Sequence, residues 1–388
     1  MSNVSSSNSH KELKPKLRFN GFSDEWVENE LQNIFTKITQ KNTNGSISNV
    51  ICNSAQKGLI PQREYFDKDI ANSDNTDGYF VIKRGDFVYN PRKSVSAPYG
   101  PVSVYNYDND GIVSPLYLCF RPKEAINTSF YEWYFKSSAW HRYVYLYGDS
   151  GVRHDRVSIK DSTFFEMPLH IPCAAEQKKL SCFLALLDTN IQKQQQLVDS
   201  LKSYKRGAIA YYFTTQMRNT ECIKTTISKC LFYEQPQKYI VHSEHYSHAY
   251  TTPVLTANKA FILGYTNEQD GIYDKGDVLI YDDFTMEVKY VKFPFKVKSS
   301  TIKMLTPQNN VDLYFMYSLL QYLGLKPEGH QRSYISILEP MEVQIPTYEE
   351  QVRAAKLFRL LDSKIEKEQL LLQEMTRMKS SLMQQLFI

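Results

Sequence analysis

One long segment occurs twice in this sequence. The stretch "IPCAAEQKKLSCFLALLDTNI" begins at Ile171, and "IPTYEEQVRAAKLFRLLDSKI" begins at Ile345, 174 residues later. Residues 171–213 and 345–387 align without a gap and are identical at 13 of 43 positions. We interpret this agreement as duplication of a unit. Because a unit and its copy pack most simply about a pseudo-two-fold axis, the repeat predicts two helices that run antiparallel.

Each copy has the pattern of one long helix. Apolar residues follow the 4-3 spacing of a coiled-coil seam, and the skipped seam position is polar in both copies, Gln194 and Glu368. A helix of about 38 residues is roughly 57 Å long, so each copy is the natural partner of the other. The alternative is two amphipathic helices packed in separate cores. The seam residues are Leu180, Leu184, Leu187, Ile191, Val198 and Leu201 in the first copy, and Ala354, Phe358, Leu361, Ile365, Leu372, Met375, Leu382 and Leu386 in the second.

The segments that precede the two helices are unlike in sequence, and both have the pattern of mixed α/β domains. Helical stretches are expected at 128–145 and 312–323, and strands at runs such as "IVSPLYLCF" and "VKYVKFPFKV". The sequence therefore predicts an α+β chain: two mixed α/β domains, separated by two long helices that form an antiparallel coiled coil with a pseudo-two-fold internal repeat. The expected parts are a disordered tail at 1–14, a first domain at 15–170, a central helix at 171–213, a second domain at 214–344 and a C-terminal helix at 345–388.

Composition limits where the protein works. No apolar run approaches the length that a membrane span needs, and the polar N-terminus has no apolar signal region. The six cysteines are widely scattered and form no CxxC pair, which favours reduced thiols. We therefore expect a cytoplasmic protein. The formal net charge is only +4, so any anion-binding surface must come from local clusters of cations.

Motifs of the common catalytic and nucleotide-binding sites are missing. The sequence has neither GxG nor GK[ST], which excludes the usual dinucleotide, adenosylmethionine and P-loop fingerprints. Asn90-Pro91-Arg92 lacks the second proline and the aromatic residue of an amino-methyltransferase motif, so we interpret it as a turn at a strand end. His242, His245 and His248 leave open a metal site, although the HExxH arrangement is absent. The pattern favours a chain that does no chemistry itself.

The sequence resembles the DNA-specificity subunits of Type I restriction-modification enzymes. Two unlike domains, each followed by a long helix that opens with Pro-x-x-x-Glu-Gln, carry the resemblance. The segments "PKLRFNGFSDEW" (15–26), "GDFVYN" and "YEQPQKYI" (233–240) are also similar to family segments. The first copy departs from the pattern at 173–175, where the second has a more typical polar helix cap.

The resemblance implies that each domain is a target recognition domain that reads one half of a bipartite double-stranded DNA site. The helices would set the spacing between the halves. Two modification subunits would bind this non-catalytic chain and supply S-adenosylmethionine and adenine methylation. Restriction subunits could add an ATP- and Mg-dependent translocating nuclease. The missing fingerprints agree with this division, because those parts would belong to partner chains.

Candidate DNA-binding residues are polar or cationic side chains near strand ends and near the two Gly-containing His-x-Arg and His-Gln-Arg segments. Phosphates attract Lys and Arg, and base edges pair with Arg, Asn, Gln, Lys or His. The alternative for each is an ordinary solvated side chain, and for the two His-containing segments it is packing against the helix root. The candidates are Lys83, Arg84, Asn90, Arg92, Lys93, Tyr99, Arg153, His154 and Arg156 in the first domain, and Lys289, Lys292, Lys296, Lys298, His330, Gln331, Arg332 and Tyr334 in the second.

Two other functions stay open at this point. The low net charge motivates a coiled-coil scaffold or adaptor without direct DNA readout, because DNA-binding proteins usually carry a stronger basic footprint. The histidine-rich segment motivates an enzyme with an unrecognised metal site near His242.

Overall fold

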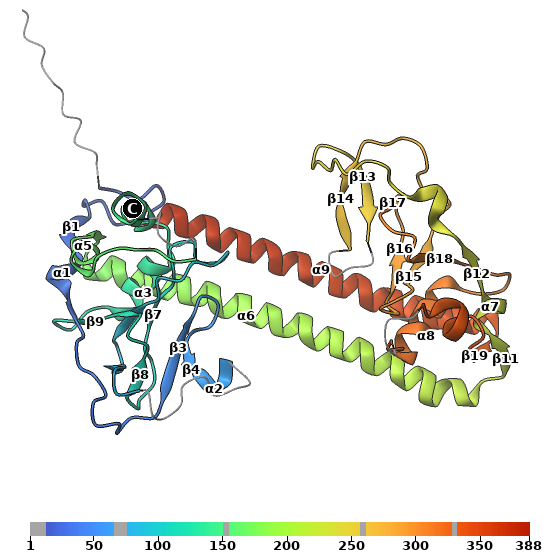
Figure 1. Ribbon diagram of the computed structural model, residues 1–388, viewed down its shortest axis with the longest axis horizontal. Helices are drawn as coiled ribbons and strands as arrows, with labels where there is room; N and C mark the ends of the chain where they lie inside the picture. Colours follow the sequence, from blue (N-terminus) through green and yellow to red (C-terminus); the bar gives the residue numbers. More distant parts are fainter. Residues whose placement is uncertain (1–12, 66–75, 150–154, 257–260, 328–331) are drawn as a thin grey trace, which may run out of the picture. The chain divides into compact units, whose positions relative to one another are not determined.

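The computed structural model in Figure 1 describes residues 13–65, 76–149, 155–256, 261–327 and 332–388. The chain divides into two compact units: Met1–Lys193 together with Leu372–Ile388, and Gln194–Leu371. Nearly all of the tail predicted at 1–14 lies outside the described residues. Both units contain sheets, helices and a buried core, so the predicted α+β class is confirmed. The domain boundaries proposed from the sequence stay a prediction.

The first unit contains two four-stranded sheets and a two-stranded ribbon. One sheet has the antiparallel order β2-β9-β6-β7, and the other has the order β4-β3-β8-β5, in which β3 and β8 are parallel. The ribbon pairs β1 with β10. The elements are β1 (Val27–Glu30), α1 (Leu31–Ile34), β2 (Phe35–Lys37), β3 (Val50–Ser54), β4 (Gly58–Pro61), α2 (Gln62–Tyr65), β5 (Phe80–Ile82), β6 (Phe87–Tyr89), β7 (Val102–Val104), β8 (Gly111–Val113), β9 (Leu118–Pro122), α3 (Thr128–Lys136), α4 (His141–Tyr147), α5 (Asp161–Phe165) and β10 (Pro168–Ile171), with parts of α6 (Ala174–Tyr211) and α9 (Tyr348–Leu386).

The second unit contains the antiparallel sheet β12-β18-β15-β16, the sheet β14-β13-β17 with β13 and β17 parallel, and a ribbon of β11 and β19. The remaining parts of α6 and α9 belong to it. Its other elements are η2 (Tyr212–Gln216), η3 (Met217–Asn219), β11 (Cys222–Thr226), α7 (Ile227–Cys230), β12 (Leu231–Glu234), η4 (Pro236–Tyr239), β13 (Thr252–Leu255), β14 (Ile262–Thr266), β15 (Val278–Asp282), β16 (Val288–Val291), β17 (Lys296–Val297), β18 (Ile302–Pro307), α8 (Leu313–Leu323), η5 (Tyr334–Leu338) and β19 (Glu342–Pro346).

The two units share one plan despite their unlike sequences. Each begins with a strand, a one-turn helix and a second strand, β1-α1-β2 in one and β11-α7-β12 in the other. In each, the opening strand pairs antiparallel with the strand that directly precedes the long helix. The four-stranded sheet of the second unit repeats the order β2-β9-β6-β7 position by position, as β12-β18-β15-β16. The duplication therefore includes the domains as well as the helices.

Both long helices contribute to the core of the first unit. Leu180 and Leu184, near the start of α6, join Met383 and Leu386 from the end of α9, and the following Phe387, in one buried cluster. This cluster also contains aromatic residues of α3 and of the sheet β2-β9-β6-β7. Burial of apolar side chains is the dominant stabilising term in a core, so the end of α9 is part of what holds the first unit together.

The core of the second unit uses the equivalent positions of the repeat. Ala354 and Phe358, near the start of α9, join Ile209 from the end of α6 and Tyr212 and Phe213 from the adjoining η2. Each of these five lies at the offset of 174 residues from one of the five repeat residues in the first core. The same side-chain positions thus complete both units, with the roles of the two helices exchanged.

The predicted seam positions lie inside: every one of them is buried or half-buried. Gln194 donates from Nε2 to the carboxylate of Glu368 at 2.7 Å. Lys205 pairs with Asp362 at 2.6 Å in the second unit, and the equivalent pair, Lys379 with Asp188, forms in the first. Within the second unit, moving forward along α6 from 194 to 205 means moving backward along α9 from 368 to 362, so the helices are antiparallel there.

Several expected elements are divided or shortened. The helix expected at 128–145 is two helices, because Ser137 ends α3 and its hydroxyl donates to the Tyr134 carbonyl at 2.6 Å. "IVSPLYLCF" contains a turn in which the Tyr117 N–H donates to the Ser114 carbonyl, and this turn separates β8 from β9. "VKYVKFPFKV" is divided near Pro294, which lacks the N–H that a strand needs. The long helices begin after Ile171 and Ile345, because those residues belong to β10 and β19.

Candidate nucleic-acid interface

Residues 90–101 form a loop in the first unit, and the two ends of this loop lie close together. The loop joins β6 to β7, and the Asn90 N–H donates to the Pro101 carbonyl at 3.0 Å. Gly100 has a φ of +84°, and a Cβ at this residue would lie 2.1 Å from the Asn90 carbonyl oxygen. Only glycine fits such a close approach with positive φ. The base of the loop is therefore fixed by backbone geometry.

The side chain of Asn90 shapes this loop. Its Oδ1 accepts a hydrogen bond from the Arg92 N–H at 3.0 Å, and its Nδ2 donates to the Asn53 carbonyl at 3.1 Å. The first bond is the turn chemistry typical of asparagine. Asn90 was a candidate for contact with bases, but in this structure its amide is used to orient Arg92.

The segment after residue 154 lies against the same loop. The Lys93 N–H donates to the Asp155 carbonyl at 2.8 Å, and the Val157 N–H donates to the Pro91 carbonyl at 2.9 Å. Arg92 and Arg156 face each other in an antiparallel bridge. The structure thereby brings together residues that are far apart in sequence. The candidates Arg153 and His154 lie outside the described residues.

Four of the predicted candidates line one hollow of about 530 Å³: Asn90, Arg92, Lys93 and Arg156. Within the described part of the chain, neither Arg92 nor Lys93 has a carboxylate partner at ion-pair distance. Within the same described residues, Arg156 pairs with its neighbour Asp155, with Nε 3.8 Å from a carboxylate oxygen. Uncompensated cations around a hollow attract anions such as phosphate groups.

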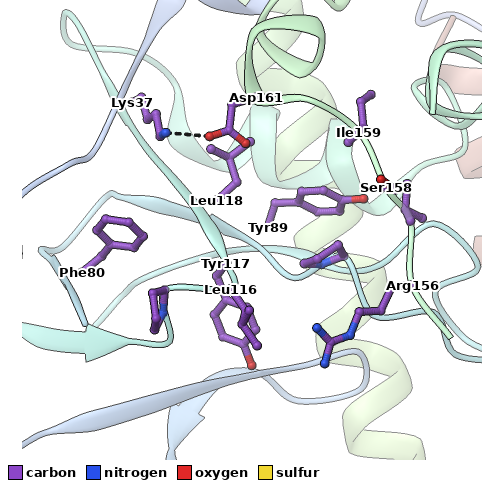
Figure 2. Close-up of a pocket in the computed structure, with 13 residues that line it drawn as sticks. Lys37, Phe80, Tyr89, Leu116, Tyr117, Leu118, Arg156, Ser158, Ile159 and Asp161 are labelled. Carbon is purple, nitrogen blue, oxygen red and sulfur yellow. Dashed lines mark ion pairs between the residues drawn. The ribbon is translucent and has the colours of Figure 1, made fainter. Parts of the chain in front are cut away.

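Sequence reasoning missed the aromatic and apolar lining of this surface. Tyr117 and Leu116 line the hollow and also a neighbouring one of about 420 Å³. Figure 2 shows the neighbouring hollow, with the Lys37–Asp161 ion pair on one side and Tyr117 and Arg156 on the other. Burial raises the pKa of Tyr117, while the charge of Arg92 opposes that shift. The only sequence signal was Ser-Pro at 114–115, which indicates a turn where we expected a strand.

The other described candidates of the first unit, Lys83, Arg84 and Tyr99, are not among the residues that line the hollow of Arg92 and Arg156. Lys83 and Arg84 follow β5, where Arg84 pairs with Asp108, and Lys83 lies 3.8 Å from Asp110. Their charges are therefore compensated locally. Tyr99 packs its ring on His141 with centroids 4.8 Å apart.

Two candidates of the second unit are buried, which corrects their assignment to a DNA-binding surface. Lys296 is 1% exposed, and its Nζ lies 2.8 Å from the Glu268 carboxylate. Tyr334 is also 1% exposed, and its ring packs on Tyr233 with centroids 4.7 Å apart. Neither side chain can reach a ligand outside the domain. Although burial opposes it, the hydrogen bond from Lys296 contributes to holding the pKa of Glu268 below its usual value.

The other described candidate cations of the second unit are partly or fully exposed. Arg332 is 66% exposed, and its Nε is 4.0 Å from the Asp283 carboxylate. Lys298 pairs with Glu244 at 2.8 Å, Lys289 lies over the Phe261 ring, and Lys292 lies over the Tyr290 ring. The candidates His330 and Gln331 fall outside the described residues.

The duplicated Pro-x-x-x-Glu-Gln motif holds each helix start to the strand before it. Gln177 donates from Nε2 to the Pro172 carbonyl at 3.0 Å, and Gln351 donates to the Pro346 carbonyl at 2.9 Å. Glu176 is fully buried and accepts two hydrogen bonds from the Arg18 guanidinium, at 2.8 and 2.7 Å. The motif therefore has a structural role, and in the first unit it also fixes the segment that contains Arg18.

The structure offers no support for the metal alternative. Among the described residues, no group of three or more His, Cys, Asp or Glu side chains could hold a metal ion. Near His242, the Glu268 carboxylate accepts from the backbone N–H groups of His242 and Ser243. A search of the described helices for one long and apolar enough to cross a membrane also finds none.

Comparisons with known proteins agree on one family. Residues 236–377 match the family model described as Type I restriction modification DNA specificity domain. A specificity subunit of the Type I restriction enzyme EcoR124I/EcoR124II from Escherichia coli is 48% identical over 120 residues, which are 29% of this chain and 30% of that relative. The sequence match thus spans less than a third of the relative's length.

Solved structures match over nearly the whole chain. The S subunit of a Type-I restriction-modification system from M. genitalium superposes with a TM-score of 0.60 at 14% identity, and covers 97% of this chain and 99% of that one. A chain from a structure concerned with complex assembly and conformational transition of the type I R-M system gives a TM-score of 0.58 at 13% identity, over 92% and 96%. At such low identity, these matches establish the fold.

Proposed function

We propose that this chain belongs to the Type I restriction-modification DNA-specificity family, is the specificity subunit of a Type I restriction-modification complex and reads a bipartite site in double-stranded DNA. One observation carries the proposal. Two units that share the strand order of one four-stranded sheet present different surface residues, and each is completed by the same positions of a duplicated helix pair. A constant framework with two variable surfaces is what reading two different half-sites requires.

In the first unit, we infer that the hollow lined by Arg92, Lys93 and Arg156 lies at the DNA. Among the described residues, Arg92 and Lys93 have no carboxylate partner at ion-pair distance, and the loop that carries these two cations has a fixed base. Phosphate contacts give affinity that falls with salt, while base contacts give specificity. The net charge of +4 is small for a protein that would bind DNA alone. We therefore expect partner subunits to supply part of the phosphate contact.

We further infer that the helix pair docks two modification subunits. Leu186 in the first unit and Leu360 in the second are equivalent, identical residues of the repeat, and they are 59% and 61% exposed. An exposed apolar residue kept at the same place in both copies fits two copies of one partner. S-adenosylmethionine and adenine-N6 methylation would belong to those subunits. Any ATP- and Mg-dependent nuclease would belong to restriction subunits.

The test is co-expression with the cognate modification subunit, followed by sequencing of methylated adenines. We expect methylation in a two-part site. Exchange of residues 214–344 for the corresponding segment of another specificity subunit should then change one half of that site and leave the other half unchanged. Exchange of residues 15–170 is the matched control and should change the opposite half.

Two results would contradict the proposal: either exchange altering both halves, or methylation that follows no two-part site. The scaffold alternative is not favoured by the family match, and it predicts that the assembled complex leaves DNA unretarded in a gel at any salt concentration. Retardation that weakens as salt rises would exclude that alternative.

A further inference from the structure

The tip of the loop at 90–101 is a closed turn with a valine at its end. Ser94 and Ala97 exchange both backbone hydrogen bonds, at 3.0 and 3.2 Å, which leaves Val95 and Ser96 at the tip. The Ala97 N–H also donates to the Ser94 hydroxyl at 3.1 Å. Val95 is fully exposed.

The residue preferences of tight turns do not explain why a valine occupies this position. Tight turns favour Gly, Asn, Asp, Ser and Pro, and a β-branched side chain prefers strands. Single exposed apolar residues are common on protein surfaces and need no explanation by themselves. Val95 differs because of its position. It lies in the turn at the tip of a loop whose two ends are held together by the hydrogen bond between Asn90 and Pro101.

The charges around Val95 indicate what the tip meets. Arg92 and Lys93 precede it on the same loop and have no carboxylate partner in the described residues. Ser94 and Ser96 add hydroxyl groups on either side. Cations and hydroxyls are the usual contacts of the DNA backbone, which they position without reading sequence. Among residues 92–97, Val95 is the large apolar side chain that is fully exposed.

The apolar feature that a major groove offers is the 5-methyl group of thymine, which small apolar side chains contact in direct readout. We propose that Val95 contacts a thymine 5-methyl group in the half-site read by the first unit. The inference rests on the proposed function, because it requires that this unit reads DNA. It names the chemical feature that one residue of the loop recognises.

The experiment replaces thymine with uracil, which removes the methyl group alone. The complex with the modification subunits is titrated with duplexes in which each thymine of the first half-site is replaced in turn. We expect one position to weaken binding about fourfold, the effect of losing burial of one methyl group. Val95→Ala should weaken binding to the thymine duplex and should bind the uracil and thymine duplexes equally.

Controls separate this inference from folding and from the proposed function. Ser96→Ala, at the other tip position, should keep the uracil effect, and replacements in the second half-site should give the same ratio for Val95→Ala and the unaltered chain. An unchanged melting temperature shows that Val95→Ala folds. The inference is overturned if no thymine in the first half-site responds, if that half-site has none, or if Val95→Ala still responds. Failure of the proposed function looks different, because two-part methylation would then be missing altogether.

Discussion

Lys296 and Lys298 show how two residues of one type, two positions apart, take different roles. Lys296 is buried, with its Nζ 2.8 Å from Glu268 and 2.6 Å from the Asp270 carbonyl. Lys298 is partly exposed and pairs with Glu244, whose carboxylate lies in solvent. A buried charge that loses its partner costs far more than a surface one.

We predict that Lys296→Ala lowers the free energy of unfolding by about 3–5 kcal/mol, because Glu268 is left without its cation. Lys298→Ala should change it by about 1 kcal/mol or less. Urea unfolding followed by circular dichroism measures both. Equal effects of the two variants would show that Lys296 is not buried in solution.

Sequence patterns could not have separated these two lysines. "VKFPFKVK" looks like an alternating surface strand, and the partner of Lys296 lies 28 residues earlier in the chain. The burial of Tyr334 was missed for the same reason, since its ring in η5 packs on Tyr233 of β12 and Tyr281 of β15. Local periodicity does not report contacts between distant segments. The sequence predicted both Arg92 and Arg156 as DNA-binding residues, but it did not indicate that the two lie side by side.

At the scale of elements, the long helices were the most predictable part. Their 4-3 spacing is local and sustained, so it identified the inward positions directly. Short strands were less predictable, because a Ser-Pro turn and Pro294 divide apolar runs that look continuous. Lys205 and Lys379 occupy the next seam positions, and their ion pairs with Asp362 and Asp188 were not anticipated. A lysine is unusual at a seam position, and the aspartate on the opposite helix explains how its charge is accommodated.

We predict that Leu186→Glu and Leu360→Glu each weaken binding of one modification subunit by about tenfold or more, because a charge would enter an apolar contact. Folding should be unaffected, since both side chains are mostly exposed. Mass photometry of the complex gives the number of bound subunits. Ala185→Glu, at an exposed neighbouring position on α6, is the control and should bind normally. Full occupancy by both leucine variants would place docking elsewhere.

At the scale of the whole molecule, the repeat extends further than sequence identity does. The helices agree at 13 of 43 positions, whereas the domains align poorly yet share their sheet order. Sheet order depends on pairings between distant strands, so it could be found only in the structure. Phe213 and Phe387 are identical residues of the repeat, and each is buried in the core of a different unit.

These two phenylalanines allow a matched test. Phe387→Ala should destabilise the first unit by about 3–5 kcal/mol, because it leaves a cavity beside Trp26 and Phe130. Phe213→Ala should do the same to the second unit, where its ring packs on Phe315 and Tyr322. Hydrogen exchange should rise in α3 for the first variant and in α8 for the second. Equal changes in both helices would mean that the units unfold together.

The division of the chain into two units also affects the order in which they can fold during synthesis on the ribosome. Domains generally fold from the N-terminus as they emerge, but here the first unit still lacks residues 372–388 after the whole of Gln194–Leu371 has been synthesised. The core of the first unit therefore stays incomplete until these last residues are synthesised. All residues of the second unit are available before that point. A chain that stops after Leu371 would keep every residue of the later unit and lose core residues of the earlier one, so premature termination would impair the half of the protein that was translated first.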